Sequence, residues 1–151
     1  MNKILSKKRL AIAVFIILDI FSIGLGMGVP LATILFGFVV GWFLPVYLEL
    51  TGEISQQTLL KLLKAGLITS AISLIILGGI WLPALSWLGD PSRDFVQFGM
   101  PLILFEPLAS FIGWIVLMVL ISPFLQFLMT IFGAVLRLAY KKYGSLETPT
   151  L

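Results

Sequence analysis

The first apolar run of this chain carries a single acidic residue at its centre. The segment Leu10–Gly28 reads LAIAVFIILDIFSIGLGMG, and the basic residues 7–9 (KKR) come immediately before it. Nineteen residues of α-helix are roughly 28 Å long, close to the hydrocarbon thickness of a bilayer. Asp19 is the middle residue of the run, where a charged side chain costs roughly 2.5–3.5 kcal/mol to insert. The run therefore predicts a membrane helix whose acid is a candidate functional residue.

The composition extends this prediction to the whole chain. Of its 151 residues, 60% are hydrophobic and 11% are charged, and the mean hydropathy is +1.13. Soluble domains carry about 25% charged residues. A core of this size cannot hold so many apolar side chains, so lipid must cover the remainder. We expect an all-α integral membrane protein with one transmembrane domain, residues 1–144.

The residue types that are missing from the sequence argue against most catalytic sites. The chain contains no cysteine and no histidine. Disulfides, Cys/His zinc sites and His-ligated haem are therefore excluded, as is nucleophilic catalysis by Ser–His or Cys–His pairs. We expect a protein that is not an enzyme, with no catalytic residue, metal or cofactor. The net charge of +3 lies at the edges of apolar runs, so we expect no nucleic-acid partner.

Four membrane spans are expected, at about 10–28, 31–50, 65–82 and 107–136. The fourth apolar stretch is the longest, and Pro107 and Pro123 interrupt it. Because the sequence around Pro123 (ISPF) offers no polar turn, we expect one long span that is kinked at both prolines. Residues 83–106 form the longer of two outer connections. Residues 54–64 (ISQQTLLKLLK) are expected to begin as a surface-lying amphipathic turn or two that runs into the third span, and 145–151 form a flexible tail.

The basic residues predict the orientation of these spans. Nine of the ten lie in the N-terminal tail, the central loop and the C-terminal tail, and only Arg93 lies elsewhere. In a four-span arrangement those three regions share one side of the membrane. Lys and Arg are enriched in cytoplasmic loops. We therefore expect a multi-pass protein of the plasma (inner) membrane with both termini in the cytoplasm.

Small and polar residues recur at helical spacing in the first three spans. Residues three, four or seven apart share one helix face, and such faces turn away from lipid. They bring together one candidate intramembrane site: Asp19, Ser22, Gly26, Thr33, Ser70 and Ser73. This site has two interpretations. It is either a proton- or cation-coupled site, or an interhelical hydrogen bond that fixes packing.

A second pattern concerns helix packing. Gly37 and Gly41 form a GxxxG match within the second apolar run. Small residues at this spacing allow two helix backbones to approach closely. The close approach is expected either within the chain or between two copies of it.

Two charged residues form an outer-side candidate, Glu106 and Arg93. Asp90, Arg93 and Asp94 are the charged residues of the longer outer connection, and Glu106 directly precedes Pro107. An ordinary solvated ion-pair arrangement explains them. An external gate or a partner-docking loop is the functional alternative.

Two functional hypotheses follow from these observations. The first is a non-catalytic subunit, or an assembly and interaction partner, of a membrane complex, in which Asp19 is a buried polar contact. The second is a small oligomeric transporter or channel-like protein that uses Asp19 for proton or cation coupling. The expected partners are the lipid bilayer and either further copies of the chain or other membrane subunits. An enzyme acting on lipid would require a second polar group near Asp19 or Glu106.

Overall fold

The computed structural model of this chain describes residues 2–25, 30–50, 55–90, 95 and 102–144. Within these residues all regular structure is helical. Gly26, Arg93 and the predicted flexible tail at 145–151 lie outside the described residues.

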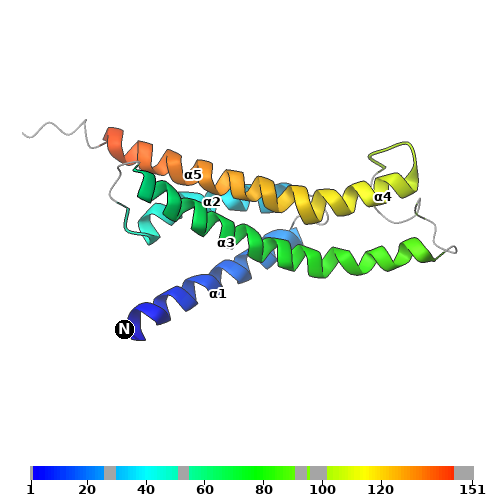
Figure 1. Cartoon of the computed structure of the whole chain (residues 1–151), viewed down its shortest axis with the longest axis horizontal. Coiled ribbons are helices and arrows are strands. Elements are labelled where there is room, and N and C mark those ends of the chain that lie inside the picture. Colours follow the sequence, from blue (N-terminus) through cyan, green and yellow to red (C-terminus); the bar gives the residue numbers. More distant parts are fainter. Residues whose placement is uncertain (1, 26–29, 51–54, 91–94, 96–101, 145–151) are drawn as a thin grey trace, which may run out of the picture.

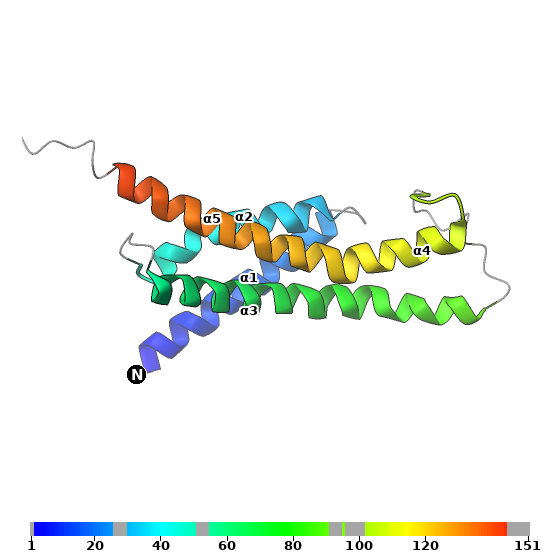
Figure 2. The same ribbon diagram turned by 45° about the horizontal axis from the view of Figure 1, so that its top comes forward.

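Four helical rods run alternately up and down the long axis of the molecule (Figure 1). The elements are α1 (Asn2–Leu25), α2 (Leu31–Tyr47), α3 (Gln56–Trp81) with the 3₁₀ helix η1 (Leu82–Gly89), and α4 (Pro107–Val116), η2 (Leu117–Ile121) and α5 (Ser122–Gly144). The start of α1, the start of α3 and the end of α5 lie at one end of the molecule. At the other end the described residues include η1 and α4 but no part of α1 or α2, because those two helices stop near the middle (Figure 2). We call this other end the distal end.

Two of these rods are long and apolar enough to cross a membrane, judged by length and composition. They are Gln56–Gly89, with 34 residues, and Pro107–Lys142, with 36. The apolar parts of the first two helices in the described chain, Leu10–Leu25 and Leu31–Tyr47, are shorter.

The third helix begins before its apolar run. It starts at Gln56, so residues 56–64 are its first turns and run directly into the third span. Ser55 explains the start, because its hydroxyl accepts a hydrogen bond from the backbone N–H of Thr58 at 3.2 Å. Such a cap satisfies one of the free donors at a helix N-terminus and stabilises the helix by about 1 kcal/mol.

The second helix ends in a turn that is normally made with glycine. Glu49 has φ 55°, in the left-handed region. The backbone N–H of Leu50 donates to the carbonyl of Pro45 at 2.9 Å, and that of Glu49 donates to Val46 at 3.2 Å. This is the hydrogen-bond pattern of a Schellman motif. Leu50 then packs with Leu44 in a buried apolar cluster, which holds the turn in place.

The two prolines of the last rod act differently. Pro107 is the first residue of α4, where its missing N–H is not needed. It begins the helix, so the predicted kink at Pro107 is absent. Pro123 follows the π-helical turn η2 and is the second residue of α5. A proline inside a helix removes one hydrogen bond and clashes with the carbonyl four residues earlier. For Pro123 that carbonyl belongs to Val119, which lies within the wider π turn η2.

Helices α2 and α5 pack with their backbones in direct contact. A Cβ atom added to Gly37 would lie 2.5 Å from the carbonyl oxygen of Gln126, and one added to Gly41 would overlap the carbonyl oxygen of Thr130. From the other side, a Cβ on Gly133 would lie 2.5 Å from the carbonyl oxygen of Phe38. The GxxxG pair is therefore used for packing within the chain.

Two apolar clusters lie toward the two ends of the bundle. One joins Leu44 and Leu62 to Leu138 near the end that carries the start of α3. The other joins Ala84 of η1 to Phe111 and Ile115 of α4 at the distal end. The helices also contact each other between these clusters, and the buried side chains there include polar ones.

We expect Gly41→Ala to destabilise the fold by about 1–3 kcal/mol, because the new methyl group meets backbone atoms of α5 that cannot rotate away. The free energy of unfolding in mixed detergent micelles measures this loss. Gly79→Ala is the matched control, since a Cβ there meets nothing within 4 Å. Its better helix propensity should leave stability unchanged or raise it by about 1 kcal/mol. Equal stability of Gly41→Ala and the wild type would contradict the close packing.

Candidate functional site

Eight buried polar side chains gather between the two apolar clusters. They come from all four rods, with exposed fractions between 0 and 9%. Their members are Asp19, Ser22, Thr33, Ser70, Ser73, Ser122, Gln126 and Thr130. We call this set the polar cluster.

Asp19 is at the centre of the polar cluster and is completely buried. Its Oδ2 accepts a hydrogen bond from the Ser73 hydroxyl at 2.6 Å, and its Oδ1 accepts one from Nε2 of Gln126 at 3.0 Å. Ser73 also lies 3.2 Å from the carbonyl oxygen of Thr69, which is the longer of its two contacts. One carboxyl group thus connects α1 to α3 and to α5.

Two further hydrogen bonds tie hydroxyl groups to the backbone of the last rod. Ser70 donates to the carbonyl oxygen of Pro123 at 2.6 Å, which adds a second link between α3 and α5. Thr130 donates to the carbonyl oxygen of Gln126, four residues earlier, at 2.8 Å. That same Gln126 carbonyl faces Gly37, so the peptide that bonds Thr130 also forms the contact with α2.

Two polar atoms of the cluster have no hydrogen-bond partner among the described residues. They are Oε1 of Gln126 and the hydroxyl of Ser122, both buried. A charged carboxylate only accepts hydrogen bonds, whereas a protonated one must also donate. A rotation of the Gln126 amide by half a turn would present Oε1 to a protonated Asp19. The glutamine can therefore match either protonation state of the acid.

Five residues of the predicted intramembrane site belong to the polar cluster. Asp19, Ser70 and Ser73 meet in the polar cluster, and Ser22 and Thr33 are buried within the same set. The direct bonds to the Asp19 carboxyl group come from Ser73 and Gln126.

Glu106 lies elsewhere. It is exposed at the start of α4, at the distal end. Its backbone carbonyl accepts from the N–H of Ser110 at 2.9 Å, and its side chain makes no capping bond. Glu106 is thus separate from Asp19.

Gln126, Ser122 and Thr130 are members of the site that the sequence analysis missed. They recur at four-residue spacing, the same signal that we used on the second and third runs. The two prolines and the length of the fourth run obscure this pattern. Gln126 is the most important omission, since it is one of the two direct partners of Asp19.

Asp19 lines neither of two cavities in the described part of the bundle. One, of about 310 Å³, lies between the end of α2 and α5 and is lined by Glu49, Arg137 and Lys141 among others. The second, of about 620 Å³, lies between α1, α2 and α3 and is lined almost entirely by apolar side chains. The carboxyl group is enclosed by protein atoms.

We expect the Asp19–Ser73 bond to contribute about 0.6–1.7 kcal/mol, the range found for hydrogen bonds between membrane helices. A double-mutant cycle with Asp19→Ala and Ser73→Ala, read from unfolding free energies in micelles, measures this coupling. Ser110→Ala is the matched control, because Ser110 is also buried but bonds to the backbone of Leu104. The losses of stability caused by Ser110→Ala and Asp19→Ala should simply add in the double variant. If the losses caused by Ser73→Ala and Asp19→Ala also add, the Asp19–Ser73 hydrogen bond is contradicted.

Within the described part of the chain, no group of three or more His, Cys, Asp or Glu side chains could hold a metal ion. What the polar cluster offers chemically is one carboxyl group with an amide and hydroxyl groups around it, which can hold helices together or bind a proton. No protein-family model, no curated protein and no solved structure matches the chain.

Proposed function

We propose that the chain is a multi-pass protein of the plasma (inner) membrane, with four spans and both termini in the cytoplasm. Large apolar side chains on the outside of all four rods support this, such as Ile17, Leu35, Ile75 and Phe124, each more than half exposed. In water such a surface would be unfavourable, whereas lipid covers it.

The arrangement of the charged helix ends supports the orientation. The start of α1, the start of α3 and the end of α5 lie at the same end of the molecule (Figure 1). Those segments carry nine of the ten basic residues of the sequence. Trp42 and Tyr140 pack against each other at 6.2 Å toward that end, and Arg137 lies 5.2 Å from the Trp42 ring. Aromatic and basic side chains together are typical of a membrane–water interface.

We further propose that the protein is a non-catalytic subunit, or an assembly and interaction partner, of a membrane complex. This proposal rests on the distal end, which extends beyond the shorter helices and exposes apolar side chains. The two long rods, 34 and 36 residues, are each roughly 50–55 Å long, whereas bilayer hydrocarbon is about 30 Å thick. Since α1 and α2 stop near the middle, the surplus length extends beyond them at the distal end.

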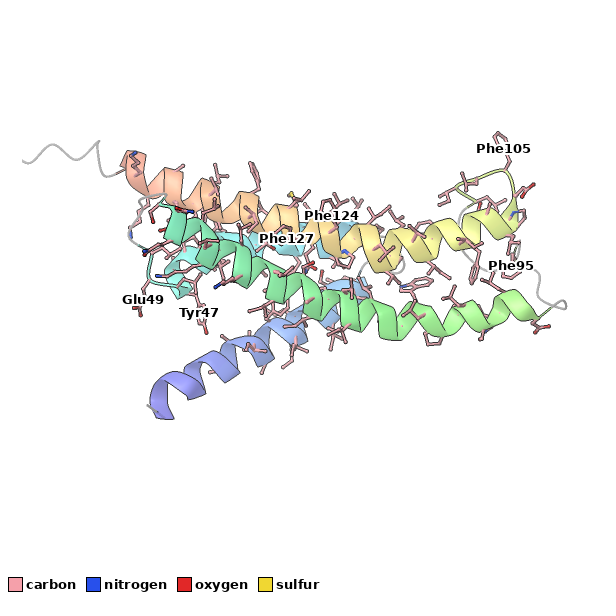
Figure 3. All side chains as sticks on the ribbon, in the orientation of Figure 1. Tyr47, Glu49, Phe95, Phe105, Phe124 and Phe127 are labelled. Carbon is pink, nitrogen blue, oxygen red and sulfur yellow. The ribbon has the colours of Figure 1, made fainter. Side chains whose placement is uncertain are left out.

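The distal end is apolar where it extends beyond the shorter helices. Its exposed side chains include Leu85 and Leu88 of η1 and the consecutive residues Leu102–Phe105. Phe105 is fully exposed and points away from the ribbon (Figure 3). Phe95, by contrast, packs on Phe111 at 5.0 Å. Exposed apolar surface beyond the hydrocarbon region calls for cover by another protein.

The position of Asp19 supports a structural role for it in this proposal. Both of its carboxyl oxygens are bonded within the chain, and it is completely buried. The acid thus holds the bundle together, and partner contacts fall to the distal end. The absence of histidine and cysteine from the sequence agrees with a non-catalytic role.

One observation favours a second candidate, the small oligomeric transporter. The unpaired Oε1 of Gln126 and the unpaired hydroxyl of Ser122 lie in the polar cluster together with the Asp19 carboxyl group. Unsatisfied buried polar atoms within a membrane are costly and mark proton or ion pathways in many transporters. In this candidate Asp19 alternates between charged and neutral forms as the Gln126 amide rotates.

Cysteine accessibility tests the orientation. The sequence has no cysteine of its own, so each introduced thiol reports one position. Ser86 and Gln57 are both exposed, one in η1 and the other at the start of α3. We expect Ser86→Cys to react with a membrane-impermeant maleimide added outside intact cells, and Gln57→Cys to react only after the membrane is opened. External labelling of Gln57→Cys would overturn the orientation.

Native mass spectrometry after mild extraction from the native membrane tests the function. We expect a foreign subunit at fixed stoichiometry, lost with Phe105→Ser and retained with Phe21→Ser, a control that changes an exposed phenylalanine on α1. The loss is expected because the distal end is then less apolar. A homo-oligomer without a foreign subunit, together with proton flux in proteoliposomes that Asp19→Asn abolishes, would replace this proposal by the transporter.

A further inference from the structure

The 620 Å³ cavity separates the N-terminal half of α1 from the other helices. Toward its N-terminus α1 diverges from α2 and α3, while its C-terminal half meets them at Asp19 (Figures 1 and 2). The walls of the cavity are formed by inward-facing residues within Leu10–Leu18 of α1, Phe36–Tyr47 of α2 with the following Leu48, and Ala65–Ile72 of α3. We call this space the apolar cavity.

The apolar cavity offers almost no hydrogen bond to an occupant. Of its lining residues only Tyr47 and Thr69 have polar side chains. The Thr69 hydroxyl already donates to the carbonyl oxygen of Gly66 at 2.8 Å. Tyr47 is the last residue of α2, so its ring lies at the end of that wall. An occupant of the interior must therefore be apolar along its length.

The length of the apolar cavity fits a hydrocarbon chain. Its α2 wall, from Phe36 to Tyr47, is roughly 17 Å long, close to the roughly 15 Å of one bilayer leaflet. The deep end of the cavity closes where Leu18 and Ile72 precede Asp19 and Ser73.

Basic residues lie toward the other end of the cavity. Lys61 and Lys64 of α3 are exposed, and each precedes the lining residue Ile68 by one or two helical turns. In the sequence of α1, residues 7–9 (KKR) directly precede the first lining residue, Leu10. Glu49, the acidic residue described at this end, lines the other cavity beside Arg137. Positive charge at the mouth of an apolar groove suits an anionic headgroup.

We propose that the apolar cavity binds one acyl chain of an anionic glycerophospholipid from the cytoplasmic leaflet, with the phosphate against Lys61 and Lys64. This inference rests on the membrane placement proposed above. The bound chain fills the space between α1 and its neighbours and thereby supports the N-terminal half of α1. The lipid is a structural ligand, and no chemical step is involved.

The test begins with the full chain in vesicles of equal parts phosphatidylcholine and phosphatidylglycerol. The protein is released in mild detergent, and retained lipid is counted by native mass spectrometry. We expect one phosphatidylglycerol per chain. Ala65→Phe and, from the opposite wall, Ala11→Phe should abolish retention because each ring fills the cavity. Ala71→Phe, on the exposed side of α3, is the control and should retain the lipid.

Charge variants test the headgroup contact separately. Replacing Lys61 and Lys64 by glutamine should lower the preference for phosphatidylglycerol over phosphatidylcholine by about fivefold for each lysine. Lys141→Gln, at the other cavity, should leave that preference unchanged. Circular dichroism of every variant, with helix content equal to the wild type, establishes that the changes report on binding.

Three results would overturn the inference. They are retention of no lipid by the wild type, equal retention of both lipids, and retention by both cavity-filling variants as strong as by Ala71→Phe. A dimer that Ala65→Phe dissociates would assign the cavity to a second copy and would overturn it too. Failure of the membrane proposal is distinguishable, because the chain would then not enter the vesicles at all.

Discussion

The hydrogen bonds of the Asp19 carboxyl group determine how this bundle is assembled. A carboxyl group without partners in an apolar interior would be strongly destabilising, so the three helices that can satisfy it must meet at one point. Ser73 and Gln126 meet that requirement from α3 and α5. The N-terminal half of α1 diverges from its neighbours beyond this contact and the stacking of Phe15 on Phe36. The apolar cavity is the space that this geometry leaves.

The pairing of α2 with α5 is of another kind. It depends on the absence of side chains at Gly37, Gly41 and Gly133, which lets two backbones touch. Dispersion between close-packed atoms stabilises such a contact in lipid as well as in water. Gln126 takes part in both the α2–α5 packing and the hydrogen bonds of Asp19. Its carbonyl oxygen faces α2, and its side chain donates to the Asp19 carboxyl group. Packing and polar contacts are thus coupled through one residue.

The helical class and the meeting of Asp19 with Ser73 could be predicted from the sequence, because both depend on local patterns. A lone acid in an apolar run must turn inward, and serines at helical spacing mark the face it meets. The partnership with Gln126 could not be derived in the same way, because it requires the rotation of α5 about its own axis. The course of the distal end also escaped prediction, since it depends on how η1 continues α3.

The π-helical turn η2 sets that rotation. Buried residues of the last rod recur every four positions from Ser110 through Trp114 and Met118 to Gln126 and Leu138. In an unbroken α-helix a four-residue repeat drifts by roughly 40° at each step, so such a line would wind around the rod and leave its neighbour. The wider turn at Leu117–Ile121 reverses part of that drift. The rod therefore packs aromatic side chains against η1 along one half and turns the acid's glutamine partner toward α1 along the other.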